Sequence, residues 1–116
     1  MSVRRIVPNL KTADPAKARK FYGDFLGLDI VMDQGWIVTY GSDAKMCPQI
    51  SFMSEGGSGA PVPDISVEVD DVDEVYARAK SAGYEIVHEL RNEPWGVRRF
   101  FVRDPFGAIV NILAHN

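Results

Sequence analysis

The stretch DISVEVDDVDEVYARAKSAG, from Asp64 to Gly83, decides the fold of this chain. Its first part alternates apolar and polar residues, which is the pattern of a β-strand with one buried face. A helix follows, because Asp71 can serve as its N-cap, Glu74 stands three residues on as a capping-box partner, and Gly83 can end it. The stretch therefore predicts a half-buried strand followed by a capped helix.

An earlier part of the chain repeats this pattern. Residues 3–10, VRRIVPNL, alternate like a strand, and Asp14 followed by Pro15 marks a helix start that Gly27 can end. The two capping residues, Asp14 and Asp71, lie 57 residues apart. Three β-rich segments follow each predicted helix, at residues 28–32, 36–40 and 47–53 in the first half and at 84–90, 97–103 and 107–113 in the second.

These repeats predict an α+β fold built from two βαβββ modules. Module one spans residues 1–53, a Gly/Ser/Pro-rich linker spans 54–63, and module two spans 64–116. Because one helix covers only one face of each sheet, neither module closes a core alone. We expect the modules to pair into a concave, partly open barrel of mixed β-sheet with the helices outside.

Composition excludes several classes of function. The chain has 116 residues, of which 46% are hydrophobic and 25% charged, and its net charge of −3 gives no electrostatic footprint for nucleic acid. Cys47 is the only cysteine, so no intrachain disulfide or thiolate zinc site is expected. The N-terminal residues lack the apolar region of a signal peptide, and no apolar run reaches transmembrane length. We expect a cytoplasmic protein without nucleic-acid or membrane partners.

Three segments carry a resemblance to a known family: PNLKTADPAKARKFYGDFLGL at 8–28, DISVEVDDVDEVYARAKSAG at 64–83 and FFVRDPFGAIVNIL at 100–113. In this order and spacing they resemble the glyoxalase / bleomycin-resistance / extradiol-dioxygenase superfamily, also called vicinal oxygen chelate. The combination of PNL with the following Asp and Phe-Tyr is most similar to the bleomycin-resistance branch. The resemblance covers nearly the whole chain.

In metal-dependent members of that superfamily, the first and last strands of each module supply His or Glu ligands to a divalent ion. The resemblance places the first-strand positions at Val7 and Asp64, and the last-strand positions at Asn111 and at Gln49 or Ser51. Valine cannot bind a metal, and amide or hydroxyl oxygens are weak ligands for zinc, nickel or iron. Only Asp64 is a competent ligand. We therefore expect no metal and no cofactor.

Side chains on the same strand faces are expected to line a small-molecule cavity. The expected ligand-binding residues combine aromatic rings, acids and amides: Asn9, Trp36, Gln49, Ser51, Asp64, Glu68, Trp95, Phe101 and Asn111, with Ser66 on the same face. An acid pair suits a cationic ligand, and the rings of Trp36 and Trp95 can stack on a planar group or cover a cation. Simpler readings stay open, since Trp36 suits a core or interface, Trp95 can close a turn, and Asp64 can pair locally.

Other polar residues are given structural roles. His88 is expected on the surface of its strand, and Arg98, Arg99 and Arg103 are expected to be surface charges or partners of acids. The alternative for one of these arginines is to hold an anionic ligand, which would overturn the expectation of a cationic one. No Ser/His/Asp arrangement and no phosphate-binding glycine loop is present in the sequence, so no catalytic residue is assigned.

The resemblance implies a homodimer that binds a small organic molecule, aromatic or cationic, without a metal, as the antibiotic-sequestering members do. The alternative is an enzyme of the same superfamily, of lyase or dioxygenase type. Such an enzyme needs either an atypical metal site or metal-free acid–base chemistry by Asp64 or Glu68. A third class is a protein–protein module with a vestigial cavity.

Overall fold

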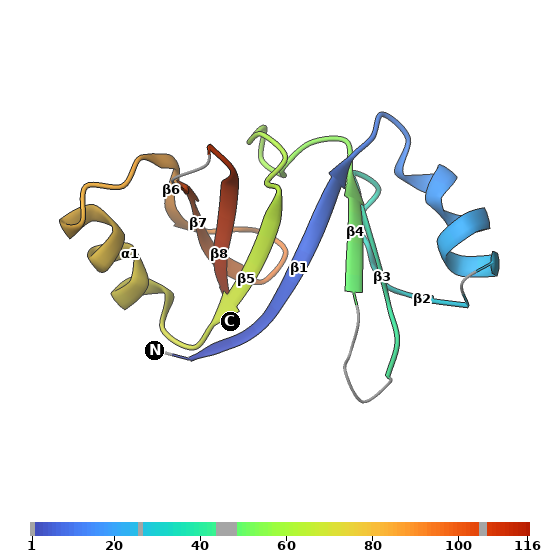
Figure 1. The fold of residues 1–116 in the computed structure, drawn as a ribbon, viewed down its shortest axis with the longest axis horizontal. Coiled ribbons are helices and arrows are strands. Elements are labelled where there is room, and N and C mark those ends of the chain that lie inside the picture. Colours follow the sequence, from blue (N-terminus) through green and yellow to red (C-terminus); the bar gives the residue numbers. More distant parts are fainter. Residues whose placement is uncertain (1, 26, 44–48, 105–106) are drawn as a thin grey trace. The chain divides into compact units, whose positions relative to one another are not determined.

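The computed structural model describes residues 2–25, 27–43, 49–104 and 107–116 (Figure 1). They divide into two compact units. One comprises the residues up to Ile6 together with Pro63–Asn116, and the other is Val7–Val62. None of the described helices is long and apolar enough to cross a membrane.

The unit Val7–Val62 has strand order β2-β3-β4-β1. Its elements are the second half of β1 (Val3–Lys11), a 3₁₀ turn (Pro15–Ala18), a π-helix (Arg19–Phe25), β2 (Asp29–Asp33), β3 (Ile37–Gly41) and β4 (Gln49–Met53). β1 runs parallel to β4, with Asn9 opposite Ser51, and the other two pairings are antiparallel. This unit is therefore a sheet with its helical segment on one face.

The other unit repeats this topology with strand order β5-β8-β7-β6. Its elements are β5 (Ile65–Val69), α1 (Val72–Ser81), β6 (Ile86–Asn92), β7 (Val97–Arg103) and β8 (Ile109–His115). β5 and β8 are parallel, as β1 and β4 are, and the remaining pairs are antiparallel. The prediction of an α+β fold with a repeated strand–helix–three-strand order is confirmed.

Alternation along the strands separates an apolar face from a polar one. Phe100, fully buried, packs with Ile112 and Val69 against α1, and the ring of Tyr76 on α1 meets that of Phe100 edge-on at 5.0 Å. In Val7–Val62 the corresponding cluster is Val38, Tyr40 and Phe52. The polar side chains of the same strands lie on the opposite face.

The start of α1 follows the prediction with one change. Asp71 accepts a hydrogen bond from the Glu74 N–H at 3.1 Å, and Gly83 adopts the left-handed conformation after the helix. In a capping box the Glu74 side chain would accept the Asp71 N–H, but here that N–H donates to Asp70 Oδ1 at 2.9 Å. Glu74 instead pairs with Arg78 one turn on, at 3.4 Å.

The first helical segment is not the predicted α-helix. It consists of the 3₁₀ turn and the π-helix, and the Asp14 side chain makes no capping hydrogen bond. Gly27 ends it with φ of +73°, as expected, and the Leu28 N–H donates to the Tyr22 carbonyl at 3.0 Å. The sequence FYGDF consists of weak helix formers, so local propensity does not hold this segment in the α-helical form.

The segment predicted as a linker forms a hydrogen-bonded loop. Gly56 and Ala60 pair through a 2.8 Å backbone bond, and the Gly59 N–H donates to Glu55 Oε1 at 3.0 Å. Parts of two other predicted features, the strand start at Cys47 and the turn at residues 104–107, lie outside the described residues.

Candidate functional site

The strongest candidate site is the face of β5, β8, β7 and β6 that points away from α1, called here the polar face and defined by Ser66, His88, Arg99, Phe101 and Asn111. In the sheet register Asn111 lies opposite both Ser66 and Phe101. Its Nδ2 donates to Ser66 Oγ at 3.1 Å. Its Oδ1 is buried and has no hydrogen-bond partner among the described residues. A buried acceptor without a partner costs roughly 1–3 kcal/mol, so this oxygen favours a hydrogen-bond donor beside it.

A buried group of charges adjoins the amide. Arg99 Nε donates to Glu93 Oε2 at 2.8 Å, and Arg91 Nε lies 2.7 Å from Glu93 Oε1. The Glu93 side chain is fully buried and that of Arg99 is 4% exposed. The guanidinium carbon of Arg99 lies 4.9 Å from the ring centre of Trp95 and 4.7 Å from that of Phe101. These rings flank a cation that the protein itself supplies.

His88 completes the polar face. Its ring lies 5.1 Å from that of Phe101, and its Nε2 lies 3.6 Å from Glu93 Oε2. Burial lowers the pKa of His88 below its ordinary 6.5, the positive charge of Arg99 lowers it further, and Glu93 opposes them. Burial likewise lowers the pKa of Arg99, against the attraction of Glu93. The imidazole is therefore neutral at pH 7.

The two acids expected in the cavity both have partners. Glu68 pairs with Arg5 at 3.1 Å and with His115 at 2.9 Å. Asp64 is exposed, and its Oδ2 accepts a hydrogen bond from the Ile109 N–H at 2.8 Å. Asp64 therefore joins the starts of β5 and β8, the local role left open for it.

Within the unit Val7–Val62, the predicted residues Asn9, Gln49 and Ser51 lie on one face of the sheet, on the paired strands β1 and β4. Ser51 Oγ and Thr39 Oγ1 share a buried hydrogen bond of 2.7 Å. Asn9 is buried opposite Ser51 in the register, and Gln49 is half-buried. Trp36 is half-buried just before β3, where its carbonyl accepts the Ser54 N–H at 2.9 Å.

Four polar residues of these faces were missed as site residues: Thr39, His88, Glu93 and Arg99. The expectation that His88 is a surface residue was wrong, because its side chain is only 14% exposed. Arg99 proved to be the partner of an acid, which was one of the roles expected for it. Strand alternation could have identified Arg99 as a residue of this face, since it stands two residues before Phe101 on one strand.

The residues at the expected metal positions do not fit a divalent ion. Val7 has no ligand atom, the Asp64 carboxylate already accepts a backbone N–H, and the Ser51 hydroxyl is shared with Thr39. Asn111 offers only a neutral amide oxygen, a weak ligand for zinc, nickel or iron. Across the part of the chain that the structure describes, no three His, Cys, Asp or Glu side chains group so as to hold a metal.

Comparison with known proteins gives the family. The family model of the Glyoxalase/Bleomycin resistance protein/Dioxygenase superfamily matches residues 5–112. Uncharacterized protein Rv0887c of Mycobacterium tuberculosis is 38% identical over 74 residues, which are 63% of this chain and 43% of that protein. Mb0911c of Mycobacterium bovis matches with the same identity over 48% of its length. The chain spans about half the length of the curated relatives it matches.

Two solved structures share the fold. The crystal structure of an NAD-dependent benzaldehyde dehydrogenase from Legionella pneumophila has a TM-score of 0.75 at 16% identity, covering 97% of this chain and 100% of that one. A superfamily member from Vibrio splendidus has a TM-score of 0.67 at 18% identity, covering 99% and 100%. At these identities the likeness concerns the fold alone. Because the family model covers nearly the whole sequence, this chain belongs to the Glyoxalase/Bleomycin resistance protein/Dioxygenase superfamily.

Proposed function

We propose that the chain binds a small organic molecule reversibly and without a metal, in the manner of the bleomycin-resistance branch, where members sequester antibiotics. The observation that carries the proposal is the buried Oδ1 of Asn111, which has no hydrogen-bond partner among the described residues. A ligand N–H or O–H would satisfy this oxygen. The ring of Phe101, opposite Asn111 in the register, supplies an apolar wall that the ring of His88 extends on the next strand.

The charges of the polar face favour an aromatic ligand over a cationic one. Glu68 pairs with Arg5 and His115, and Glu93 with Arg99 and Arg91, so neither acid is left to attract a cation. The rings of Trp95 and Phe101 already flank Arg99. The ligand is therefore a planar molecule with a hydrogen-bond donor at its edge.

The proposal extends to assembly and to the other unit. The binding form is a homodimer with a concave, partly open barrel, as the sequence resemblance implies. Within Val7–Val62, the residues proposed to contact a ligand are Asn9, Trp36, Gln49 and Ser51. Sedimentation equilibrium tests the assembly. A monomer at all concentrations, with binding intact, would remove the dimer from the proposal.

The experiment for ligand binding is an NMR screen of ¹⁵N-labelled protein with planar aromatic fragments that carry an amide or phenol donor. Asn111→Leu is expected to weaken the best fragment about tenfold or more, since one hydrogen bond to a buried acceptor is worth about 1–3 kcal/mol. Asn116→Leu, at an exposed position, is the matched control. Equal binding by Asn111→Leu and wild type would overturn the assignment. Binding lost in EDTA and restored by zinc would overturn the metal-free reading.

A metal-free enzyme is the second candidate, and the state of His88 favours it. A neutral imidazole in a largely buried position can accept a proton from a bound molecule. Mass spectrometry of the incubated fragments distinguishes the two functions. Conversion by wild type but not by His88→Gln would establish the enzyme, whereas unchanged fragments support reversible binding.

A further inference from the structure

A hollow lies on the helix side of the unit Val7–Val62, between the π-helix and strands β2 and β3. One part, of about 240 Å³, is lined by Ala16, Arg19, Ile30, Asp33, Gly35, Val38 and Tyr40. An adjoining part, of about 380 Å³, is lined by Arg19, Gly23, Asp24, Leu28, Asp29, Ile30 and Tyr40. The two parts share three lining residues and together are called the helix-side cavity. The larger lies near the lower end of the ~300–1,000 Å³ typical of ligand pockets.

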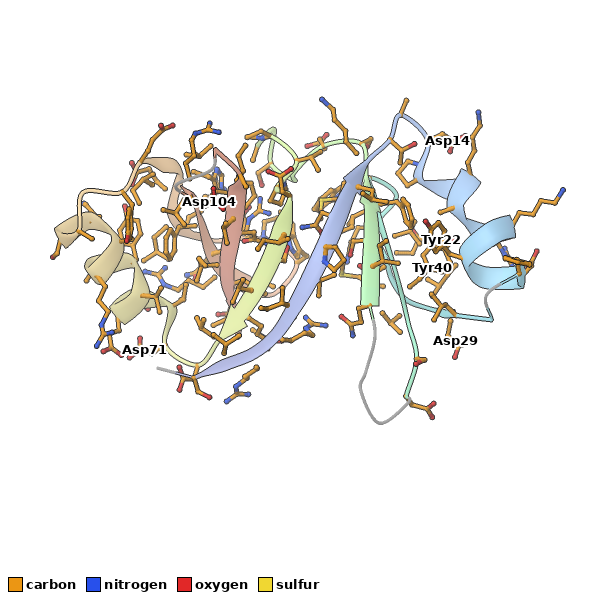
Figure 2. The ribbon with its side chains drawn as sticks, in the orientation of Figure 1. Asp14, Tyr22, Asp29, Tyr40, Asp71 and Asp104 are labelled. Atoms are coloured by element: carbon orange, nitrogen blue, oxygen red, sulfur yellow. The ribbon has the colours of Figure 1, made fainter. Side chains whose placement is uncertain are left out.

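The helix-side cavity is separate from the residues proposed for the superfamily function. Tyr40 and Thr39 are neighbours on β3, so their side chains point to opposite faces of the sheet. The Thr39 hydroxyl bonds to Ser51 on the face away from the cavity. Figure 2 shows Tyr22 and Tyr40 between the strands and the helical segment, with Asp29 nearby on β2.

Tyr40 presents its hydroxyl group to this cavity. The residue is 1% exposed, and its ring packs against Phe52 and Tyr22 with centroids 6.1 Å and 6.4 Å away. No described group hydrogen-bonds to its hydroxyl, although Tyr40 lines both parts of the cavity. The hydroxyl oxygen is not itself sealed off, so a molecule that occupies the cavity can hydrogen-bond to it.

Gly23 keeps the wall beside Tyr40 open. Its backbone is not in the left-handed region, and an added Cβ would lie 3.5 Å from Tyr40 Cε1 and 3.5 Å from Arg19 Cγ, which is ordinary contact. Neither conformation nor crowding requires glycine here, although a mid-helix glycine costs about 0.5–1 kcal/mol relative to alanine. Its absent side chain leaves space in the cavity wall.

The cavity carries both signs of charge. Arg19 forms no ion pair with any described acid, and its charge lowers the pKa of Tyr40, while burial, Asp33 and Asp24 raise it. Burial is the largest effect, so the phenol keeps its proton at neutral pH and can donate a hydrogen bond. A cationic donor and a phenol therefore lie near carboxylates that are not paired with that cation.

We propose that the helix-side cavity binds a small zwitterionic α-amino acid with an apolar side chain. The ligand carboxylate accepts hydrogen bonds from Arg19 and the Tyr40 hydroxyl. The ligand ammonium lies by Asp24 and Asp29, and its side chain lies against Leu28 and Ile30. This is a second binding site, independent of the one on the polar face.

The test is a ¹⁵N NMR titration of the full chain with L-leucine, 4-methylpentanoate, which lacks the ammonium, and 3-methylbutylamine, which lacks the carboxylate. L-leucine is expected to shift the resonances of Gly23 and Ile30 saturably, with each truncated analogue at least tenfold weaker. Absence of saturable shifts with L-leucine would overturn the proposal. Equally tight binding of the amine or of the acid would overturn the zwitterion assignment.

Two variants tie binding to the cavity. Tyr40→Phe keeps the ring and removes only the hydroxyl, so it is expected to weaken L-leucine about tenfold, while Tyr84→Phe, at an exposed site in the other unit, leaves binding unchanged. Gly23→Ala is expected to raise the melting temperature and to weaken L-leucine binding. Destabilisation of the variant cannot explain both results, because it would lower the melting temperature. Wild-type affinity in both cavity variants would overturn the site. Asn111→Leu is expected to leave L-leucine binding unchanged, so the proposal for this cavity and the proposal for the polar face can be refuted independently.

Discussion

Arg99 Nε and Glu93 Oε2 lie 2.8 Å apart in an ion pair that is almost wholly shielded from water. A charge in such a place is tolerated only while its partner is present, because desolvation costs several kcal/mol for each ion. The pair thus links the loop after β6 to the middle of β7 and holds the guanidinium between Trp95 and Phe101.

Glu93→Gln is expected to lower the free energy of unfolding by about 3 kcal/mol, because it leaves the Arg99 charge buried without a counter-charge. Urea denaturation measures the loss. Glu85→Gln is the control, since Glu85 pairs with Arg103 at 3.3 Å with a side chain 64% exposed, and its loss is expected to stay below about 1 kcal/mol. Equal losses in the two variants would contradict the buried-pair argument.

Protonation of His88 is expected to make stability depend on pH. The pKa of His88 is lowered in the folded state, so below its ordinary 6.5 the unfolded chain binds the proton more readily. The contribution of neutral His88 to the free energy of unfolding is complete above pH 6.5 and is lost as the pH falls toward the pKa of His88 in the folded state. Urea denaturation from pH 8 to pH 5 should show a shallower decline for His88→Gln. An NMR titration placing the His88 pKa above 6.5 would refute the prediction.

The two predicted helix caps are expected to differ in energy. Asp71→Ala removes a hydrogen bond to the Glu74 N–H and should cost about 1 kcal/mol. Asp14→Ala removes no capping bond, so a smaller loss is expected. Thermal melts of both variants test the difference, and a larger loss for Asp14→Ala would show that the first helical segment depends on its cap after all.

Gly56→Ala is expected to destabilise the loop at residues 54–63 strongly. A Cβ at Gly56 would lie 1.9 Å from the Pro61 carbonyl oxygen, which is backbone and cannot swing aside. A loss of about 3 kcal/mol follows from such overpacking. Gly59→Ala meets open space, and only its φ of +76° opposes the side chain, for about 1–2 kcal/mol. A melting temperature for Gly56→Ala equal to that of Gly59→Ala would mean that the loop repacks freely.

Local patterns were sufficient to predict most of the fold. The alternation around Ser66 predicted β5, and the Asp71 cap with the Gly83 stop predicted α1. Asn111 was placed on the same face as Ser66 by the family resemblance combined with strand alternation, and the two are hydrogen-bonded. Such features depend on residues close in the chain, which is why sequence suffices for them.

Features that depend on distant partners were not predictable. Arg98 and Arg99 are adjacent and chemically identical, yet Arg98 pairs with Asp73 on α1 and Arg99 is buried with Glu93 on the other side of the sheet. Alternation assigns them to opposite faces of β7, but the identity of each partner comes only from the tertiary structure. The helix-side cavity depends on the winding of residues 19–25, which packing rather than propensity sets.

Strand β1 belongs to both units, since its residues up to Ile6 group with Pro63–Asn116 and those from Val7 group with Val7–Val62. As the chain leaves the ribosome, every residue of Val7–Val62 is made before Pro63, so that unit can fold during translation. Arg5 must wait for Glu68, its ion-pair partner in β5. Residues made before the unit Val7–Val62 therefore pair only after that unit is complete. A translational pause after Val62 would leave the start of β1 as an open strand edge, available to other nascent chains.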